Sequence, residues 1–150
     1  MEFSPRYVHT NLIANDWKRL SDFYQAVFEC VPVPPERDLS GPAIEAATNI
    51  EHAHIRGEHL RLPGWGKDGP TLEIFSYSPN LDHPISEVNR PGFGHIAFSV
   101  TDVELAKKRT LESGGKPIGE VVRVPVGEKA VTFCYLTDPE GNIIELQSWS

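Results

Sequence analysis

Apolar residues follow a helical spacing in two stretches of the chain. In the first, they recur at intervals of three and four positions: Trp17, Leu20, Phe23, Tyr24, Val27 and Phe28. The second is weaker and stops before Gly114 and Gly115: Val103, Leu105, Ala106, Thr110 and Leu111. This spacing gives a helix one apolar face, so each stretch is predicted to be a helix that covers a sheet. Asp16 and Asp102 stand just before the stretches and are predicted to be their N-caps.

Apolar and polar residues alternate in segments that are predicted to be strands. Apolar neighbours flank a carboxylate in 71–78 and again in 143–150, and these segments are expected to be the last strands of two halves. Shorter strands are expected at 53–56, 59–62, 120–124 and 131–136, with turns at Pro63-Gly64, Val126-Gly127 and 138–142. The stretch 31–49, rich in Pro, Glu and Ala, has no regular pattern. It is a candidate for a mobile lid or an interface arm.

The two halves of the chain resemble each other. His9 precedes Asp16 by seven positions, and His95 precedes Asp102 by seven positions. Each half then continues with a helix and three strands, and ends with a Glu between apolar neighbours followed by Ser, an aromatic residue and Ser. The sequence therefore predicts an α+β fold of two tandem βαβββ modules, about 5–80 and 92–150, in one domain spanning 1–150.

Charge and composition exclude several classes of protein. Fourteen Lys plus Arg and 21 Asp plus Glu give a net charge of −7 without any long basic run, so a nucleic-acid partner is not expected. No apolar stretch approaches the ~18 residues that span a bilayer, and no signal peptide is evident, so we expect a soluble cytoplasmic protein and no membrane partner. The two cysteines, Cys30 and Cys134, are interpreted as reduced structural thiols.

The carboxylates inside the two last strands are candidates for chemistry. An ionised Glu that is buried without a partner costs several kcal/mol, so these residues must be paired, protonated or bound to metal. Strand alternation points Glu73 and Glu145 away from their apolar neighbours, toward a face that His9 and His95 can also reach. Two imidazoles and two carboxylates suit one divalent cation. The alternative is a pair of solvent-facing glutamates with two structural histidines, which the duplication of both residue types makes improbable.

Two stretches, Gly92 to Asp102 and Asp138 to Glu145, resemble the most recognisable motifs of the vicinal-oxygen-chelate superfamily. That superfamily includes glyoxalase I, methylmalonyl-CoA epimerase, extradiol dioxygenases, and the fosfomycin and bleomycin resistance proteins. The resemblance covers nearly the whole chain except 31–49. It implies two modules that form an open half-barrel around a metal, with these residues as the four ligands: His9, Glu73, His95 and Glu145.

The resemblance favours one class of reaction within that superfamily. Glyoxalase and epimerase members use a fourth ligand at the position of Glu73, whereas a dioxygenase must keep positions open for oxygen. We therefore expect a metal-dependent lyase or isomerase that transfers a proton beside a metal-polarised carbonyl of a small molecule, with Glu73 or Glu145 as the catalytic base. The ion could be Ni, Co, Mn, Zn or Fe. The alternatives are a metal-free, drug-sequestering protein of the bleomycin-resistance type and a ring-cleaving dioxygenase.

Other positions bear on substrate and assembly. Bacterial glyoxalase I usually has Arg and Asn where this chain has Ile13 and Tyr77, which argues against glutathione as a co-substrate. The histidines 52, 54 and 59 are expected on a solvated surface. The modules could pair within one chain or across two, and a homodimer is expected. Core packing is the preferred interpretation of five aromatic residues that are also candidates for substrate contact: Phe75, Tyr77, Phe98, Phe133 and Trp149.

Overall fold

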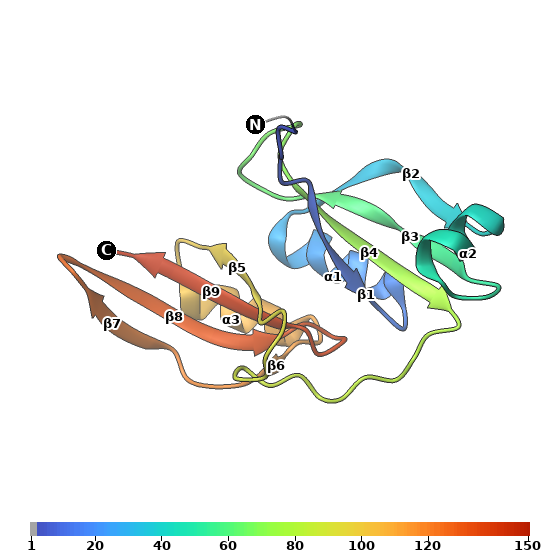
Figure 1. Ribbon diagram of the computed structural model, residues 1–150. Coiled ribbons are helices and arrows are strands. Elements are labelled where there is room, and N and C mark those ends of the chain that lie inside the picture. The colour runs from blue at the N-terminus through green and yellow to red at the C-terminus, as the bar shows by residue number, and fades with distance from the viewer. Residues whose placement is uncertain (1–2) are drawn as a thin grey trace. The chain divides into compact units, whose positions relative to one another are not determined.

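The computed structural model describes residues 3–150, which form two compact units: one ends at Asp82 and the other runs from His83 to Ser150 (Figure 1). Each unit consists of one sheet with a helix against one face, as the predicted βαβββ modules require. The elements of the first unit are β1 (His9–Ile13), α1 (Trp17–Phe28), β2 (Val31–Leu39), α2 (Pro42–Thr48), β3 (His54–Arg61) and β4 (Thr71–Ser78).

The first sheet has the strand order β1-β4-β3-β2, in which β1 runs parallel to β4 and the other pairs are antiparallel. Helix α1 packs against β3 and β4. Its predicted apolar face is buried there, with Leu20 and Tyr24 fully enclosed and Phe23 nearly so. Each such side chain contributes about 1.5–3 kcal/mol by leaving water, which fixes α1 to one face of the sheet and leaves the opposite face for polar groups.

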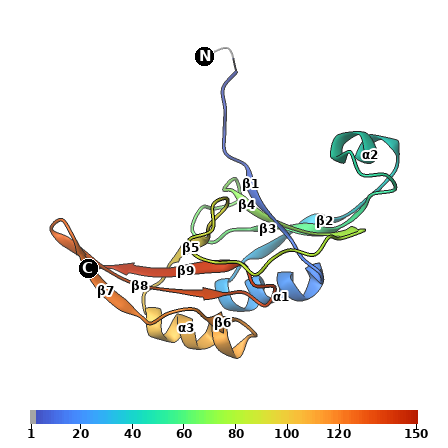
Figure 2. The same cartoon turned by 60° about the horizontal axis from the view of Figure 1, so that its bottom comes forward.

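The second unit repeats this arrangement. Its sheet has the order β5-β9-β8-β6, with β7 paired to β8, and β5 runs parallel to β9 as β1 does to β4. Helix α3 packs against β8 and β9 (Figure 2). The elements are β5 (Ile96–Ser99), α3 (Val103–Glu112), β6 (Lys116–Pro117), β7 (Val122–Val126), β8 (Lys129–Thr137) and β9 (Ile143–Trp149).

Both predicted N-caps are confirmed. The Asp16 carboxylate accepts a hydrogen bond from the Arg19 backbone N–H at 3.0 Å, and the Asp102 carboxylate accepts one from the Leu105 backbone N–H at 2.9 Å. Each bond satisfies an amide that has no partner within its helix. The two helices therefore begin at equivalent places in the two units.

The interpretation of 31–49 as an irregular arm is wrong for its first half. Residues Val31–Leu39 form β2, which pairs with β3. The prolines in this segment lack a backbone N–H, but β2 is an edge strand, where one side of the backbone needs no partner. The two short strands expected at 53–56 and 59–62 are in fact the single strand β3. Because the two predicted strands form one, the three strands that follow α1 in the first module are β2, β3 and β4.

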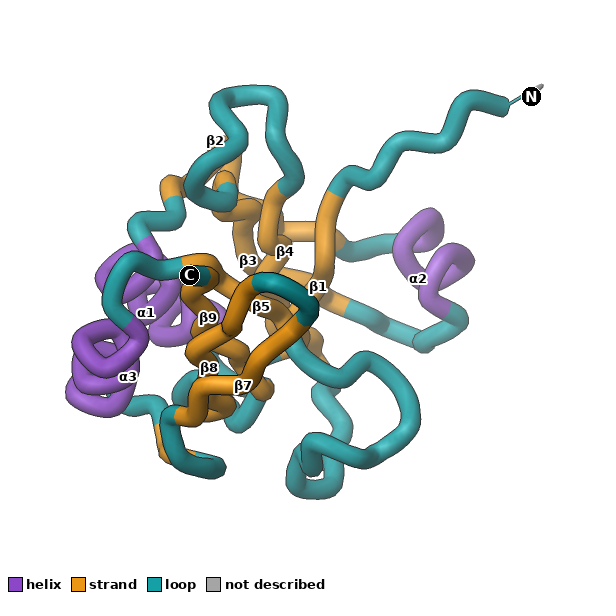
Figure 3. Tube along the Cα trace, turned by 90° about the vertical axis from the view of Figure 1, so that its left-hand side faces the viewer, coloured by secondary structure: helices purple, strands orange, loops and turns teal. Residues whose placement is uncertain are grey.

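Helix α2 occupies the second half of the same segment. It begins with Pro42 in its first turn, where the missing N–H has no cost, and it ends at Thr48, followed by Asn49 as a C-cap in the left-handed conformation. None of its residues is buried. In Figures 2 and 3 it projects beyond the end of β2 and covers no face of the sheet. No helix among residues 3–150 is both long and apolar enough to cross a membrane.

Gly57 on β3 is required by the close approach of β4. A Cβ at this position would lie 1.9 Å from the Ile74 carbonyl oxygen and 2.7 Å from Cδ1 of Phe75. Because a backbone atom cannot rotate away, Gly57→Ala is expected to lower the free energy of unfolding by about 3 kcal/mol or more. Urea unfolding measures the loss. Gly119→Ala is the control, since a Cβ there meets nothing within 4 Å; equal losses in the two variants would contradict this account.

The two cysteines are free and buried, as predicted. Burial raises the pKa of the Cys30 thiol to about 12 and also raises the pKa of the Cys134 thiol. For Cys30 this lowers the thiolate fraction at pH 8 on the order of 1000-fold relative to a free thiol. We expect iodoacetamide to leave both thiols unmodified in the folded protein and to alkylate both in urea, as mass spectrometry would show. Rapid alkylation of Cys30 without denaturant would contradict this expectation.

Candidate metal centre

Strand alternation positions both glutamates as the sequence predicts. On β4, Leu72 and Ile74 are buried on the face that α1 covers, so Glu73 between them lies on the opposite face. On β9, Ile144 and Leu146 are fully buried on the face that α3 covers, and Glu145 lies on the other. The two carboxylate side chains are only 13% and 16% exposed, which makes polar partners necessary.

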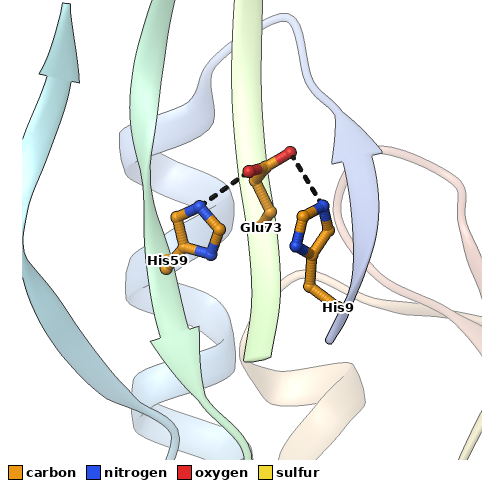
Figure 4. A group of neighbouring side chains, drawn as sticks. All are labelled: His9, His59 and Glu73. Carbon is orange, nitrogen blue, oxygen red and sulfur yellow. Dashed lines mark ion pairs between the residues drawn. The ribbon is translucent and has the colours of Figure 1, made fainter. Parts of the chain in front are cut away.

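Three side chains converge on the polar face of the first sheet (Figure 4). The Glu73 carboxylate lies between two imidazoles: its Oε1 is 3.5 Å from Nε2 of His9, and its Oε2 is 2.6 Å from Nε2 of His59. One ligand atom from each residue lies within 4.8 Å of the other two. Two imidazole nitrogens and a carboxylate oxygen in this arrangement are a donor set suited to a first-row divalent metal.

Neighbouring side chains hold this cluster in place. Asn11 Nδ2 donates to Oε1 of Glu73 at 2.9 Å, and Nδ1 of His59 lies 3.0 Å from the Thr71 hydroxyl. The His9 and His59 rings meet edge to face with their centroids 5.2 Å apart. Because these residues come from three adjacent strands, the sheet itself sets the positions of the donors.

The expectation that His59 is a surface residue is wrong. Its side chain is only 16% exposed, and β3 lies between β4 and β2, so His59 is not on a sheet edge. In the antiparallel register His59 is the direct partner of Glu73. Burial lowers the pKa of His59. The Glu73 carboxylate raises this pKa, whereas Arg37 and His9 lower it further. The sequence could have indicated His59 only through its position opposite Glu73. That position becomes visible only when His54–Arg61 is taken as a single strand.

The second unit contains the other pair of predicted ligands. Nε2 of His95 lies 3.0 Å from Oε2 of Glu145. His95 stands immediately before β5. The register partner of Glu145 is Tyr135, whose ring centroid is 5.1 Å from that of His95. Tyr135, which the sequence did not single out, therefore takes the place in this unit that His59 takes in the first.

The aromatic residues proposed for substrate contact occupy different surroundings. Phe75 is buried, with its ring 6.2 Å from that of His59, and Tyr77 shares its face of β4. Phe133 lies 5.7 Å from Tyr135, on the face that carries Glu145. Trp149 is about half exposed. Phe98 is the exception, because its register partner is Leu146, on the face that α3 covers.

The residues proposed as ligands thus fall into two His–Glu pairs, each within its own unit. His9 lies beside Glu73, and His95 lies beside Glu145. In both pairs a largely buried carboxylate faces an imidazole, which is the chemistry that a site for a divalent cation needs. The residues present therefore fit such an ion. That all four bind one ion stays a prediction.

Comparison with known proteins agrees with this duplicated arrangement. The family model of the Glyoxalase/Bleomycin resistance protein/Dioxygenase superfamily matches residues 6–146. The chain belongs to this superfamily. The match includes both His–Glu pairs and both units, so the resemblance seen in the motifs is confirmed at the level of the superfamily, while the branch within it is not determined. A search of curated proteins found no match.

Solved structures show the same fold. A glyoxalase family protein from Bacillus cereus superposes with a TM-score of 0.82 at 18% identity, over 96% of this chain and 93% of that one. FosX, a fosfomycin resistance protein from Listeria monocytogenes, gives a TM-score of 0.63 at 17% identity, over 99% and 95%. A second FosX structure, in complex with Mn(II) and sulfate, gives 0.51 at 16% identity, over 97% and 93%.

Proposed function

We propose that this protein is a metal-dependent lyase or isomerase that moves a proton beside the carbonyl group of a small molecule. One observation supports this most strongly: each unit holds a largely buried Glu against a His on the sheet face opposite its helix. A protein that only sequesters a ligand has no need of two such pairs. The Mn(II) in the FosX complex supports a divalent cation as the cofactor.

The ligands we propose are His9, Glu73, His95 and Glu145, the set implied by membership of the superfamily. When bound, a divalent cation would act as a Lewis acid that polarises a carbonyl or enediolate oxygen. The protein residues would orient the substrate and move the proton. The aromatic candidates that lie on the polar faces of the two sheets, where the rings could pack against a small substrate, are Phe75, Tyr77, Phe133 and Trp149.

The two glutamates, Glu73 and Glu145, differ in the number of hydrogen-bonding contacts that hold their carboxylates. Glu73 is held at both oxygens, by Asn11 at Oε1 and by His59 at Oε2. Glu145 contacts His95 through Oε2. A base must turn toward the carbon from which it takes a proton, and fewer contacts make that turn easier. We therefore propose Glu145 as the base: its carboxylate accepts the proton from the carbon beside the carbonyl and returns it to that carbon or to the adjacent one.

Exchange of substrate hydrogen with solvent deuterium tests this proposal. The protein, supplied with Mn(II) or Co(II), is incubated in deuterated water with a panel of 2-hydroxyketones, 2-oxoaldehydes and thioesters, and deuterium beside the carbonyl is followed by NMR. At least one substrate is expected to exchange. Glu145→Gln should then slow exchange by about 100-fold or more, because general-base catalysis contributes 10²–10⁴-fold. Binding of panel compounds without exchange would favour sequestration.

Oxygen consumption distinguishes the proposed proton transfer from the remaining alternative, a ring-cleaving dioxygenase. A ring-cleaving dioxygenase would consume oxygen when it is supplied with Fe(II) and catechols, whereas proton transfer leaves the oxygen concentration unchanged. An oxygen electrode makes the comparison directly. We expect no consumption above that of Fe(II) alone, and catechol-dependent consumption that Glu73→Gln abolishes would contradict the proposed proton transfer.

A further inference from the structure

The two units are not equivalent in the donors that they offer. In the first, Glu73 has a His on each side, His9 on β1 and His59 on β3. In the second, Glu145 has His95 on one side and Tyr135 at the position that matches His59. A neutral phenol is a poorer ligand for a divalent cation than an imidazole. The first unit therefore carries three donors where the second carries two.

We propose that the first unit binds a divalent cation by itself, through His9, His59 and Glu73, and that this binding does not require His95 or Glu145. The inference rests on the proposed function, because that function requires a divalent cation as the cofactor. It differs from that function by adding His59, a ligand outside the four that the superfamily implies. It predicts which half of the chain dominates the affinity.

The distances between donors are near those of a bound site. Ligand atoms about 2.1 Å from a metal lie about 3.0–3.4 Å apart at octahedral or tetrahedral angles. The two His–Glu distances are 3.5 Å and 2.6 Å, and the donors of all three residues lie within 4.8 Å of one another. Small side-chain rotations are enough to bring all three to one ion.

The surroundings favour His59 as a ligand through Nε2. The Thr71 hydroxyl at Nδ1 orients the ring so that Nε2 points to Glu73, as the outer partners of metal-binding histidines do. Asn11 restrains Glu73 from the opposite side. The exposed fraction of the side chain is 16% for His59 and 13% for Glu73, but 35% for His9. The His9 side is therefore the open side, where water or a substrate oxygen could complete the shell.

A second role for His59 makes different predictions. If His59 only hydrogen-bonds to Glu73, it positions that carboxylate and its ring never contacts the ion. Loss of an outer partner also weakens metal binding, by about 10–100-fold, so affinity alone does not separate the two roles. The number of imidazoles bound to the ion does separate them, because a positioning His leaves no signal from direct coordination.

The experiment uses the full-length protein and Co(II). Calorimetry gives the affinity and the stoichiometry, and proton NMR counts the imidazole N–H signals that the paramagnetic ion shifts. We expect His59→Gln to weaken binding by at least about 10-fold and to remove one shifted signal. The double variant His95→Gln with Glu145→Gln should still bind one Co(II) and should keep two shifted signals. His54→Gln is the matched control, because His54 lies on the same strand but pairs with Asp38.

The possible results distinguish a failure of this inference from a failure of the proposed function. Loss of Co(II) from the His95→Gln, Glu145→Gln variant while His59→Gln binds normally would overturn the inference and leave the proposed function intact. Two shifted signals in both the parent protein and His59→Gln would also overturn it. No binding by the parent would contradict the proposed function itself. If His59→Gln does not fold, as judged by circular dichroism, the signal count in the double variant still decides.

Discussion

Replacement of Glu73 by Gln is expected to weaken the binding of a divalent cation by 100-fold or more. Glu73 is the anionic member of the cluster with His9 and His59, and Gln keeps its size but removes its charge. Loss of an outer partner alone costs about 10–100-fold, and loss of a charged ligand should exceed that range. Calorimetric titration with Co(II) measures the change.

The control for this variant is Glu51→Gln. It makes the same change in net charge at a side chain that is 87% exposed and that lies beside His52, which is not a proposed ligand. It is expected to bind Co(II) as the parent does. If Glu73→Gln and Glu51→Gln bind equally well, then Glu73 is not a ligand and the site proposed in the first unit does not exist.

Saturation with the metal is expected to raise the melting temperature by about 5–10 °C. An ion that binds only the folded protein stabilises it by about 2.7 kcal/mol at 100 times its dissociation constant. For a chain of 150 residues, each kcal/mol corresponds to about 2–4 °C. Calorimetric melting with Mn(II), and again after EDTA is added, measures the effect and its reversal.

Two comparisons make this measurement specific. Ca(II) at the same concentration has the same charge but prefers shells of oxygen ligands, so it should shift the melting temperature far less than Mn(II) does. Glu73→Gln should lose most of the Mn(II) effect. An equal shift with Ca(II), or a full shift in Glu73→Gln, would assign the stabilisation to a different site.

Most of the fold could be predicted because its signals are local. The helical spacing around Leu20 and Tyr24 reflects burial on one face, and Asp16 and Asp102 act within three residues of their own positions. The two-module arrangement could be predicted because the two halves of the chain repeat the same pattern, so that each half makes the other easier to interpret. The strand β2 was missed because its prolines suppress the usual strand pattern, and an edge position that tolerates them is a property of the sheet, not of the segment.

The site was predicted in part, for the same physical reason. Glu73 and Glu145 are recognisable because a carboxylate between buried apolar neighbours is costly unless it is paired. His59 gives no such signal, because its importance comes from the register that places it opposite Glu73. Register depends on the turn between β3 and β4 and on pairing across the sheet. A residue whose role depends on cross-strand pairing is found only when the strands themselves are correctly placed.

The most direct test of the central claim is the metal content of the protein, determined by elemental analysis after purification without chelator or affinity nickel. We expect about one divalent ion of Mn, Fe, Co, Ni or Zn per chain. An absence of bound metal that persists after reconstitution with each of these ions would contradict this expectation, and would leave metal-free ligand sequestration as the better explanation of the fold.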